Sequence, residues 1–177
     1  SIRRRQRQMC IRDSGCSCRG TAGFAHVSCL AEQAKILVAE AEENNLSHKT
    51  WNERWFRWYN CSLCEQSYHG VVWCALGWAC WKTYVGRSET DVARQYAMNL
   101  LAGGLYATKN YEDALSVMEA QLPMMRRLGD SAHNILALQS NLANTYQGLR
   151  RLEQAMLLKG KVYSCLLYTS PSPRDSD

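Results

Sequence analysis

Apolar residues in the first part of the chain recur with the spacing of an α-helix. Their positions follow the i, i+4, i+7, i+8, i+11 pattern of one helical face. The members of this face are Leu30, Ala34, Leu37, Val38 and Ala41. The pattern predicts a helix that follows Cys29 directly and ends near Asn44 and Asn45.

Three tryptophans predict a second, short helix. Trp51, Trp55 and Trp58 have helical spacing, with Arg54 and Arg57 between them, so the indole rings form one ridge. Such a ridge packs into a core or serves as a binding surface, and its large apolar area favours the core. The longest uncharged run follows at 70–81, and it is shorter than the roughly 20 residues of a membrane-spanning helix.

The second half of the chain repeats its pattern after 41 residues. This shift superposes Leu101 on Leu142, Ala102 on Ala143, Leu105 on Tyr146, Tyr111 on Leu152, Glu112 on Glu153 and Ala114 on Ala155. A shared period predicts repeated pairs of antiparallel helices, in which the alanines mark close approaches. Pro123 falls in the second helix of the first pair and is expected to kink or end it.

These pairs resemble tetratricopeptide repeats of the longer kinesin-light-chain type, above all in NLANTYQGLRRLEQA at 141–155. The resemblance implies an α-helical solenoid whose concave groove binds a protein partner. The residues expected to line that groove are Asn99, Gly103, Ser140, Asn144 and Gln147. Amphipathic hairpins of no particular family are the alternative.

A break in composition separates the repeats from the part before them. All six tryptophans lie before residue 85, and residues 88–164 contain neither tryptophan nor cysteine. The predicted boundary is at 86–91, where Ser88 and Asp91 have the spacing of a capping box. We therefore expect a first domain at 15–87 and two repeats at 88–164.

Both ends of the chain resemble translated sequencing adapters. The matching stretches are RRQRQMCIRDS at 4–14 and CLLYTSPSPRD at 165–175, so residues 1–14 and 165–177 are expected to be non-native. A natural basic arm and a Ser/Pro tail are the alternative. The two ends contain six Arg and three Asp and so carry +3 of the net charge of +5. The segment between them is nearly neutral, which does not favour nucleic-acid binding.

Three short pairs of cysteine and histidine predict a zinc site. Their order is Cys-x-Cys, then His and Cys three positions apart, then Cys-x-x-Cys, a spacing that lets each turn of backbone supply two ligands. The expected ligands are Cys16, Cys18, His26, Cys29, Cys61 and Cys64. Closely paired cysteines in a chain of this length favour metal binding in a reducing compartment. An intracellular protein is therefore expected, in the cytoplasm or the nucleus.

The segment CSCRGTAGFAHVSCL at 16–30 resembles the RING-CH (RING-variant) finger, a cross-braced fold with two zinc ions. The resemblance implies that Cys16, Cys18, Cys61 and Cys64 share one Zn²⁺. It also implies that His26 and Cys29 share a second ion with a Cys-x-x-Cys upstream, where the adapter-like sequence stands. The gap of 31 residues between Cys29 and Cys61 implies a helical insertion. The PHD finger is the alternative resemblance, because it has the same ligand order, although the gap before its histidine is shorter.

Taken together, these patterns predict a mainly α chain: a small zinc finger with a helical insertion, followed by a repeat solenoid. The resemblance implies a ubiquitin ligase that docks a conjugating enzyme, although Gln33 and Glu65 replace a tryptophan and a cation usual in such fingers. A non-catalytic adaptor and a histone-tail reader are the alternatives. No nucleophile motif or phosphate loop indicates another enzyme. Cys74, Cys80 and the remaining histidines are expected to be ordinary structural residues.

Overall fold

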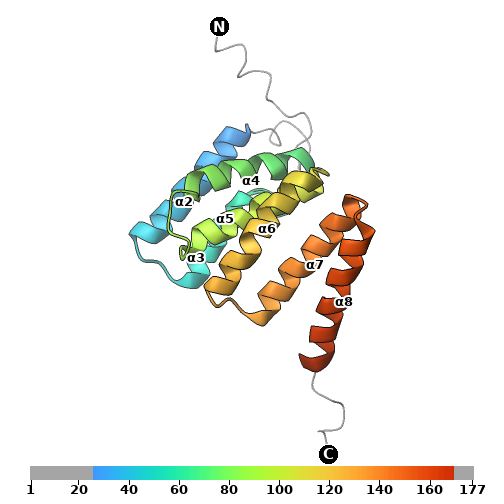
Figure 1. The fold of residues 1–177 in the computed structure, drawn as a ribbon. Coiled ribbons are helices and arrows are strands. Elements are labelled where there is room, and N and C mark those ends of the chain that lie inside the picture. The colour runs from blue at the N-terminus through green and yellow to red at the C-terminus, as the bar shows by residue number, and fades with distance from the viewer. Residues whose placement is uncertain (1–25, 170–177) are drawn as a thin grey trace, which may run out of the picture. The chain divides into compact units, whose positions relative to one another are not determined.

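The computed structural model describes residues 26–169, with the backbone alone for 166–169. The predicted ligands Cys16 and Cys18 fall outside this range. The described chain is helical, as predicted, and contains no strand. Its elements are α2 (Val27–Glu43), α3 (His48–Trp55), the 3-10 helix η2 (Phe56–Trp58), α4 (Gly70–Tyr84), α5 (Val92–Ala107), α6 (Tyr111–Arg127), α7 (Ala132–Gly148) and α8 (Leu152–Thr169) (Figure 1).

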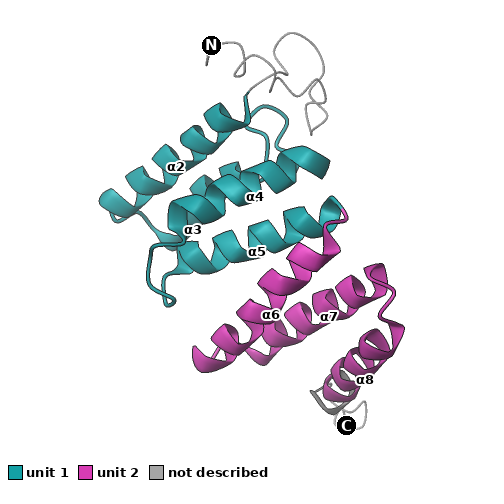
Figure 2. Cartoon of the chain, turned by 45° about the horizontal axis from the view of Figure 1, so that its top comes forward, with its two compact units in different colours: residues 1–108 teal, residues 109–177 magenta. Residues whose placement is uncertain are grey.

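The chain divides into two compact units, Ser1–Thr108 and Lys109–Asp177 (Figure 2). The division falls between α5 and α6, inside the first predicted repeat. The boundary predicted at 87/88 rests on a change in amino-acid composition, and it stays a prediction. In the structure, α5 belongs to the same compact unit as α2, α3 and α4. No helix in 26–169 combines the length and the apolar character needed to cross a bilayer.

Helix α2 confirms that the first expected helix exists, but it starts earlier than expected, so Cys29 lies inside its first turn rather than before it. It begins one residue after His26 and ends at Glu43, where Asn44 caps it and Asn45 turns the chain with a φ of 48°. The left-handed region suits asparagine, because its short polar side chain tolerates positive φ. Of the predicted apolar face, Ala34, Val38 and Ala41 are buried.

The tryptophan ridge belongs to α3 and η2. Ser47 caps α3 by accepting a hydrogen bond from the Thr50 amide at 3.3 Å. Trp55 and Trp58 are 4% and 0% exposed, and the Trp51 and Trp55 rings stack with centroids 5.1 Å apart. Burial of this size agrees with the core interpretation, since two large rings leave water almost entirely.

Helices α4 and α5 approach closely through glycines on both sides. A Cβ on Gly77 would lie 3.0 Å from the Leu101 Cα, and one on Gly104 would lie 2.7 Å from the Cys74 Cα. Each glycine therefore faces the backbone of the other helix. Because backbone atoms cannot move aside as a flexible side chain can, glycine is required at this seam.

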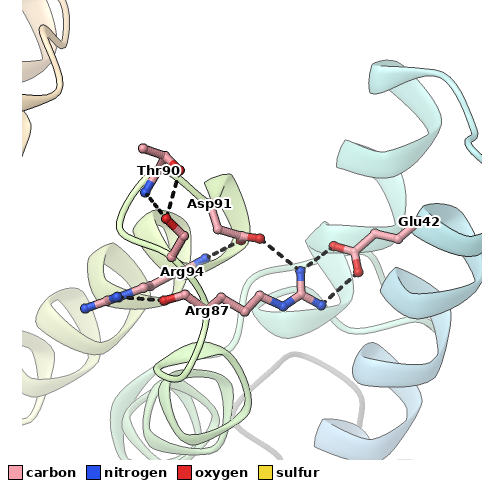
Figure 3. Close-up of polar contacts among 6 residues, drawn as sticks. Glu42, Arg87, Thr90, Asp91 and Arg94 are labelled. Atoms are coloured by element: carbon pink, nitrogen blue, oxygen red, sulfur yellow. Dashed lines mark hydrogen bonds and ion pairs between the residues drawn. The ribbon is translucent and has the colours of Figure 1, made fainter.

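A charged network fixes the segment between α4 and α5 to the end of α2 (Figure 3). Arg87 Nη1 and Nη2 donate to the two carboxylate oxygens of Glu42, each at 2.8 Å, and its guanidinium lies 4.7 Å from the Tyr84 ring centroid. The N-cap of α5 is Asp91, which accepts from the Arg94 amide at 3.1 Å. The predicted capping role of Ser88 is therefore wrong, since its hydroxyl accepts from the Thr90 amide in the turn before the helix.

In the second unit, α7 packs against both α6 and α8. Thr145 is fully buried, and its hydroxyl donates to the Asn141 carbonyl at 2.8 Å. The Tyr146 hydroxyl donates to Glu119 Oε1 at 2.8 Å, and a Cβ on Gly148 would lie 2.8 Å from the Tyr111 ring. A hydroxyl, a phenol and a glycine thus fit α7 against α6.

Helix α6 continues through Pro123 to Arg127, so the proline does not end this helix, and a kink there stays a prediction. Proline lacks the amide that would bond four residues back, which removes a single backbone hydrogen bond. Met118 before it and Met124 and Met125 after it are all buried. The apolar packing on both sides of the proline opposes a break in the helix.

The backbone repeats with the predicted period. Lys109 and Arg150, which are 41 residues apart, both turn the chain with positive φ, at 62° and 58°. The next helix in each case buries its matched alanine, with Ala114 0% and Ala155 2% exposed. The described part is therefore helical and repeat-like, in agreement with the sequence pattern.

Candidate metal centre

The Cys61-x-x-Cys64 pair lies on a tight turn between η2 and α4. Asn60 and Ser67 form an isolated antiparallel bridge at its base. Inside it, the Cys61 amide donates to the Gln66 carbonyl at 2.9 Å, and the Glu65 amide donates to the Cys61 carbonyl at 3.0 Å. Glu65 has a φ of 58°, so the chain reverses directly after Cys64. We call residues 59–68 the knuckle hairpin.

Within the hairpin, a backbone amide donates a hydrogen bond to a cysteine sulfur. The Leu63 amide donates to Cys61 Sγ at 3.4 Å. A donor in this position stabilises negative charge on sulfur, and the thiolate is the form that binds metal. Cys61 is buried and Cys64 is half-buried. The local geometry therefore suits two thiolate ligands of one zinc ion.

Apolar packing joins the knuckle hairpin to α2 and α4. Cys61 and Tyr68 form one buried cluster with Val72 and Leu76 of α4. Val27 and Leu30 of α2 pack against this cluster. The hairpin is thus placed against the helix start that carries the other described ligand pair.

His26 and Cys29 lie at the start of α2. His26 is the N-cap residue, its side chain caps nothing, and its carbonyl accepts from the Cys29 amide at 2.9 Å. Both residues are exposed. A pair at the first turn of a helix can give two ligands to one ion, so the position fits the expected half-site.

Within residues 26–169, no three His, Cys, Asp or Glu side chains gather closely enough to hold a metal ion. In the cross-braced arrangement, three ligands of one ion need not lie within the described residues. One site would add Cys16 and Cys18 to Cys61 and Cys64, and the other would add an upstream pair to His26 and Cys29. Each predicted site therefore has two ligands in the described range, and zinc binding stays a prediction.

The remaining cysteines and histidines have structural surroundings. Cys74 and Cys80 are buried free thiols in α4, and burial raises the pKa of Cys80 well above its usual value. That thiol stays neutral near pH 7 and is a poor metal ligand. His48 pairs with the Asn52 amide at 3.1 Å, and His69 lies 3.3 Å from the Ser67 carbonyl. His133 is exposed.

The five residues expected to line a peptide groove are divided between the units. Asn99 is exposed on α5, whereas Gly103 faces the Trp73 ring, 2.7 Å from the place of a Cβ. On α7, Ser140 donates to its own helix at the Leu136 carbonyl, and Asn144 is exposed. Gln147 accepts from Lys159 at 2.7 Å. One continuous groove through all five stays a prediction.

Sequence reasoning missed two features of the first unit. The ion pair between Glu42 and Arg87 joins residues 45 positions apart, and no local pattern indicates such a pair. The second feature is a cavity lined by rings of Trp55, Tyr59 and Tyr96. The density of aromatic residues is the signal that could have indicated this cavity.

Comparison with known proteins finds no match to a family model, a curated protein or a solved structure.

Proposed function

We propose that this chain is a zinc-binding module for protein interaction, of the RING-CH type, joined to helical repeats of tetratricopeptide type. The observation that carries the proposal is the knuckle hairpin, in which a backbone amide lies 3.4 Å from Cys61 Sγ. In the proposal, Cys16, Cys18, Cys61 and Cys64 hold one Zn²⁺. His26 and Cys29 supply half of a second site.

Zinc fits this hairpin better than redox chemistry does. In the redox type of Cys-x-x-Cys, the nucleophilic thiolate gains stabilisation from a helix N-terminus. Here both cysteines precede α4 by several residues, and they lie on a non-helical turn. A Cys-x-x-Cys pair on a non-helical turn is typical of a structural zinc site.

Protein binding is the proposed role of the surface around the zinc. Leu63 stands between the two ligands and is 66% exposed, which leaves an apolar side chain at the tip of the turn. In the second unit, Asn144 separately offers an exposed amide on α7 for a peptide backbone. Each of these side chains suits protein docking rather than an active site with a nucleophile.

Ligase activity is the proposed extension of this role. The finger would bind a charged conjugating enzyme, and the repeats would hold the substrate near its thioester. The chain itself would supply orientation and no catalytic side chain. Autoubiquitination with a panel of conjugating enzymes tests this extension. Failure with every enzyme would leave the non-catalytic adaptor as the function.

Zinc content is the direct test of the proposal. We expect about one tightly bound ion per chain by metal analysis, because only one of the two four-ligand sites is complete. Cys64→Ala should abolish most of that zinc. Cys74→Ala is the matched control, since Cys74 is a free thiol outside the ligand pattern. A zinc content near zero in the unaltered chain would refute the cross-braced site.

A further inference from the structure

A cavity of about 530 Å³ lies in the first unit, beside the knuckle hairpin. This size is within the usual range of ligand pockets. Its walls come from α3, η2, the hairpin, α4 and α5. Six aromatic side chains contribute to the lining: Trp55, Phe56, Tyr59, Tyr68, Trp73 and Tyr96. We call this cavity the aromatic cleft.

The rings of the aromatic cleft are held by one another. The Trp55 and Tyr96 centroids are 5.7 Å apart at a steep angle, and Phe56 and Tyr59 are 5.5 Å apart edge to face. Trp55 is buried, whereas Phe56 is 43% and Tyr96 is 36% exposed. The buried Trp55 ring supports Tyr96, and the half-buried Tyr59 ring supports Phe56. Ordering the cleft on binding therefore loses little conformational entropy.

The polar groups in the lining are all neutral. Asn52, Ser67 and Asn99 contribute amides and a hydroxyl, and no charged side chain of residues 26–169 lines the cleft. Tyr59 adds a neutral phenol to the lining, and a phenol can donate a hydrogen bond. An anionic ligand would lose water here without meeting an opposite charge.

We propose that the aromatic cleft binds an uncharged, proline-rich segment of a partner protein in the polyproline II conformation. Such segments dock in grooves lined by aromatic rings, because the pyrrolidine rings are flat and pre-ordered. Their backbone has no internal hydrogen bonds, so its carbonyls are free to accept from phenols and amides. The neutral lining selects this ligand over an anionic peptide.

The cleft shares a wall of the knuckle hairpin with the proposed metal centre but contains none of its ligands. None of Cys61, Cys64, His26 and Cys29 lines it, and of the residues expected in the repeat groove it includes only Asn99. The two proposals are therefore separable, since loss of peptide binding and loss of zinc are measured independently. Zinc content is determined on every sample used for binding.

Fluorescence anisotropy of a labelled, acetylated ten-residue polyproline peptide with the full chain tests the proposal. A Gly/Ser peptide of the same length is the comparison ligand. We expect saturable binding of polyproline and at least roughly tenfold weaker binding of the Gly/Ser peptide. Equal binding of the two peptides would overturn the proposal, as would no binding of either.

Three variants locate the binding. Phe56→Ala should weaken it by roughly tenfold, as removal of an exposed aromatic contact does. Tyr96→Phe removes only a hydroxyl and should weaken it by about fivefold. Trp78→Ala is the matched control, because Trp78 is a similarly exposed aromatic outside the lining and its loss should change affinity less than about twofold.

Every outcome of these binding measurements either supports or overturns the proposal. If Phe56→Ala fails to fold by circular dichroism, Tyr96→Phe alone decides, since it keeps the ring. Unchanged affinity in Tyr96→Phe and in a folded Phe56→Ala would overturn the proposal. A trimethyl-lysine peptide is included because aromatic rings also bind such cations. Binding of that peptide in preference to polyproline would make the cleft a cation cage and refute the assignment.

Discussion

The Arg87 guanidinium holds the Glu42 carboxylate through two parallel hydrogen bonds of 2.8 Å, and so ties the start of the α4–α5 connection to the end of α2. Both side chains are about one-third exposed. The same Arg87 extends toward Asp91 at 3.4 Å, and its carbonyl accepts from Arg94 at 2.7 Å. The pairing with Glu42 raises the pKa of Arg87, which keeps the guanidinium charged throughout. This fork joins residues 45 positions apart and links the segment that precedes α5 to α2.

Arg87→Lys should lower the free energy of unfolding by about 1 kcal/mol, because lysine keeps the charge and loses the two-point fork. Urea denaturation measures the change. The matched control is Arg151→Lys in the second unit, whose pair with Glu112 is more exposed and should contribute about 0.5 kcal/mol or less. A larger loss in the control than in Arg87→Lys would contradict the structural role of the fork.

Two glycine substitutions should change stability in opposite directions. Gly104→Ala places a Cβ 2.7 Å from the Cys74 Cα, and the resulting clash should cost about 1–3 kcal/mol. Gly160→Ala in α8 meets nothing within 4 Å and should stabilise by roughly 0.5–1 kcal/mol through helix propensity. Thermal unfolding of both variants provides the check. Equal behaviour would mean that α4 and α5 do not approach as closely as the structure shows.

The sequence predicts most of the fold because local periodicity determines most of it. The apolar face with Ala34 and Val38 predicts α2, and the matched alanines at 114 and 155 predict the repeated helices. The sequence allows Pro123 to end α6, but the helix continues, because the burial of methionines on both sides outweighs the low helix propensity of proline. The Glu42 to Arg87 fork and the aromatic cleft depend on contacts between distant segments, which a linear pattern does not contain.

Stability should decline as the pH rises above about 9, because of two buried acids in the first core. Burial raises the pKa values of both Cys80 and Tyr84 above the ordinary values of 9.0 and 10.0. The unfolded chain therefore releases these protons at lower pH than the folded chain does, which favours unfolding at alkaline pH. Their stabilising contribution is fully present below pH 9.

Urea midpoints at pH 7.5 and 9.5 measure this decline. Cys80→Ala removes one of the two groups and should reduce the difference between the midpoints. Glu32→Gln is the control, since Glu32 is an exposed side chain outside this core and its replacement should leave the difference unchanged. A chain whose stability is the same at both pH values would show that the two groups are not buried in solution.

Removal of zinc should loosen the knuckle hairpin and leave most of the first unit helical. The reason is that the described part of this unit has two apolar clusters. One contains Cys61 and Tyr68 with Leu76 and depends on the hairpin. The other contains the buried Trp58, Cys80, Tyr84 and Ala97, together with further residues of α2 and α5, and has no residue of the predicted metal ligands. This second cluster should therefore survive the removal of zinc.

Hydrogen exchange with and without a chelator tests whether chelation loosens the hairpin alone or unfolds the whole first unit. Amides at 59–68 and at the start of α2 should exchange faster after chelation, because a structural zinc site contributes folding free energy that its removal takes away. Amides at the α4–α5 seam, near Gly77 and Gly104, should stay protected by helix packing. The Cys61→Ser, Cys64→Ser double variant should match the chelated protein without any chelator. Loss of protection throughout α2 to α5 would show that zinc supports both clusters, and unchanged exchange at 59–68 would show that the hairpin forms without metal.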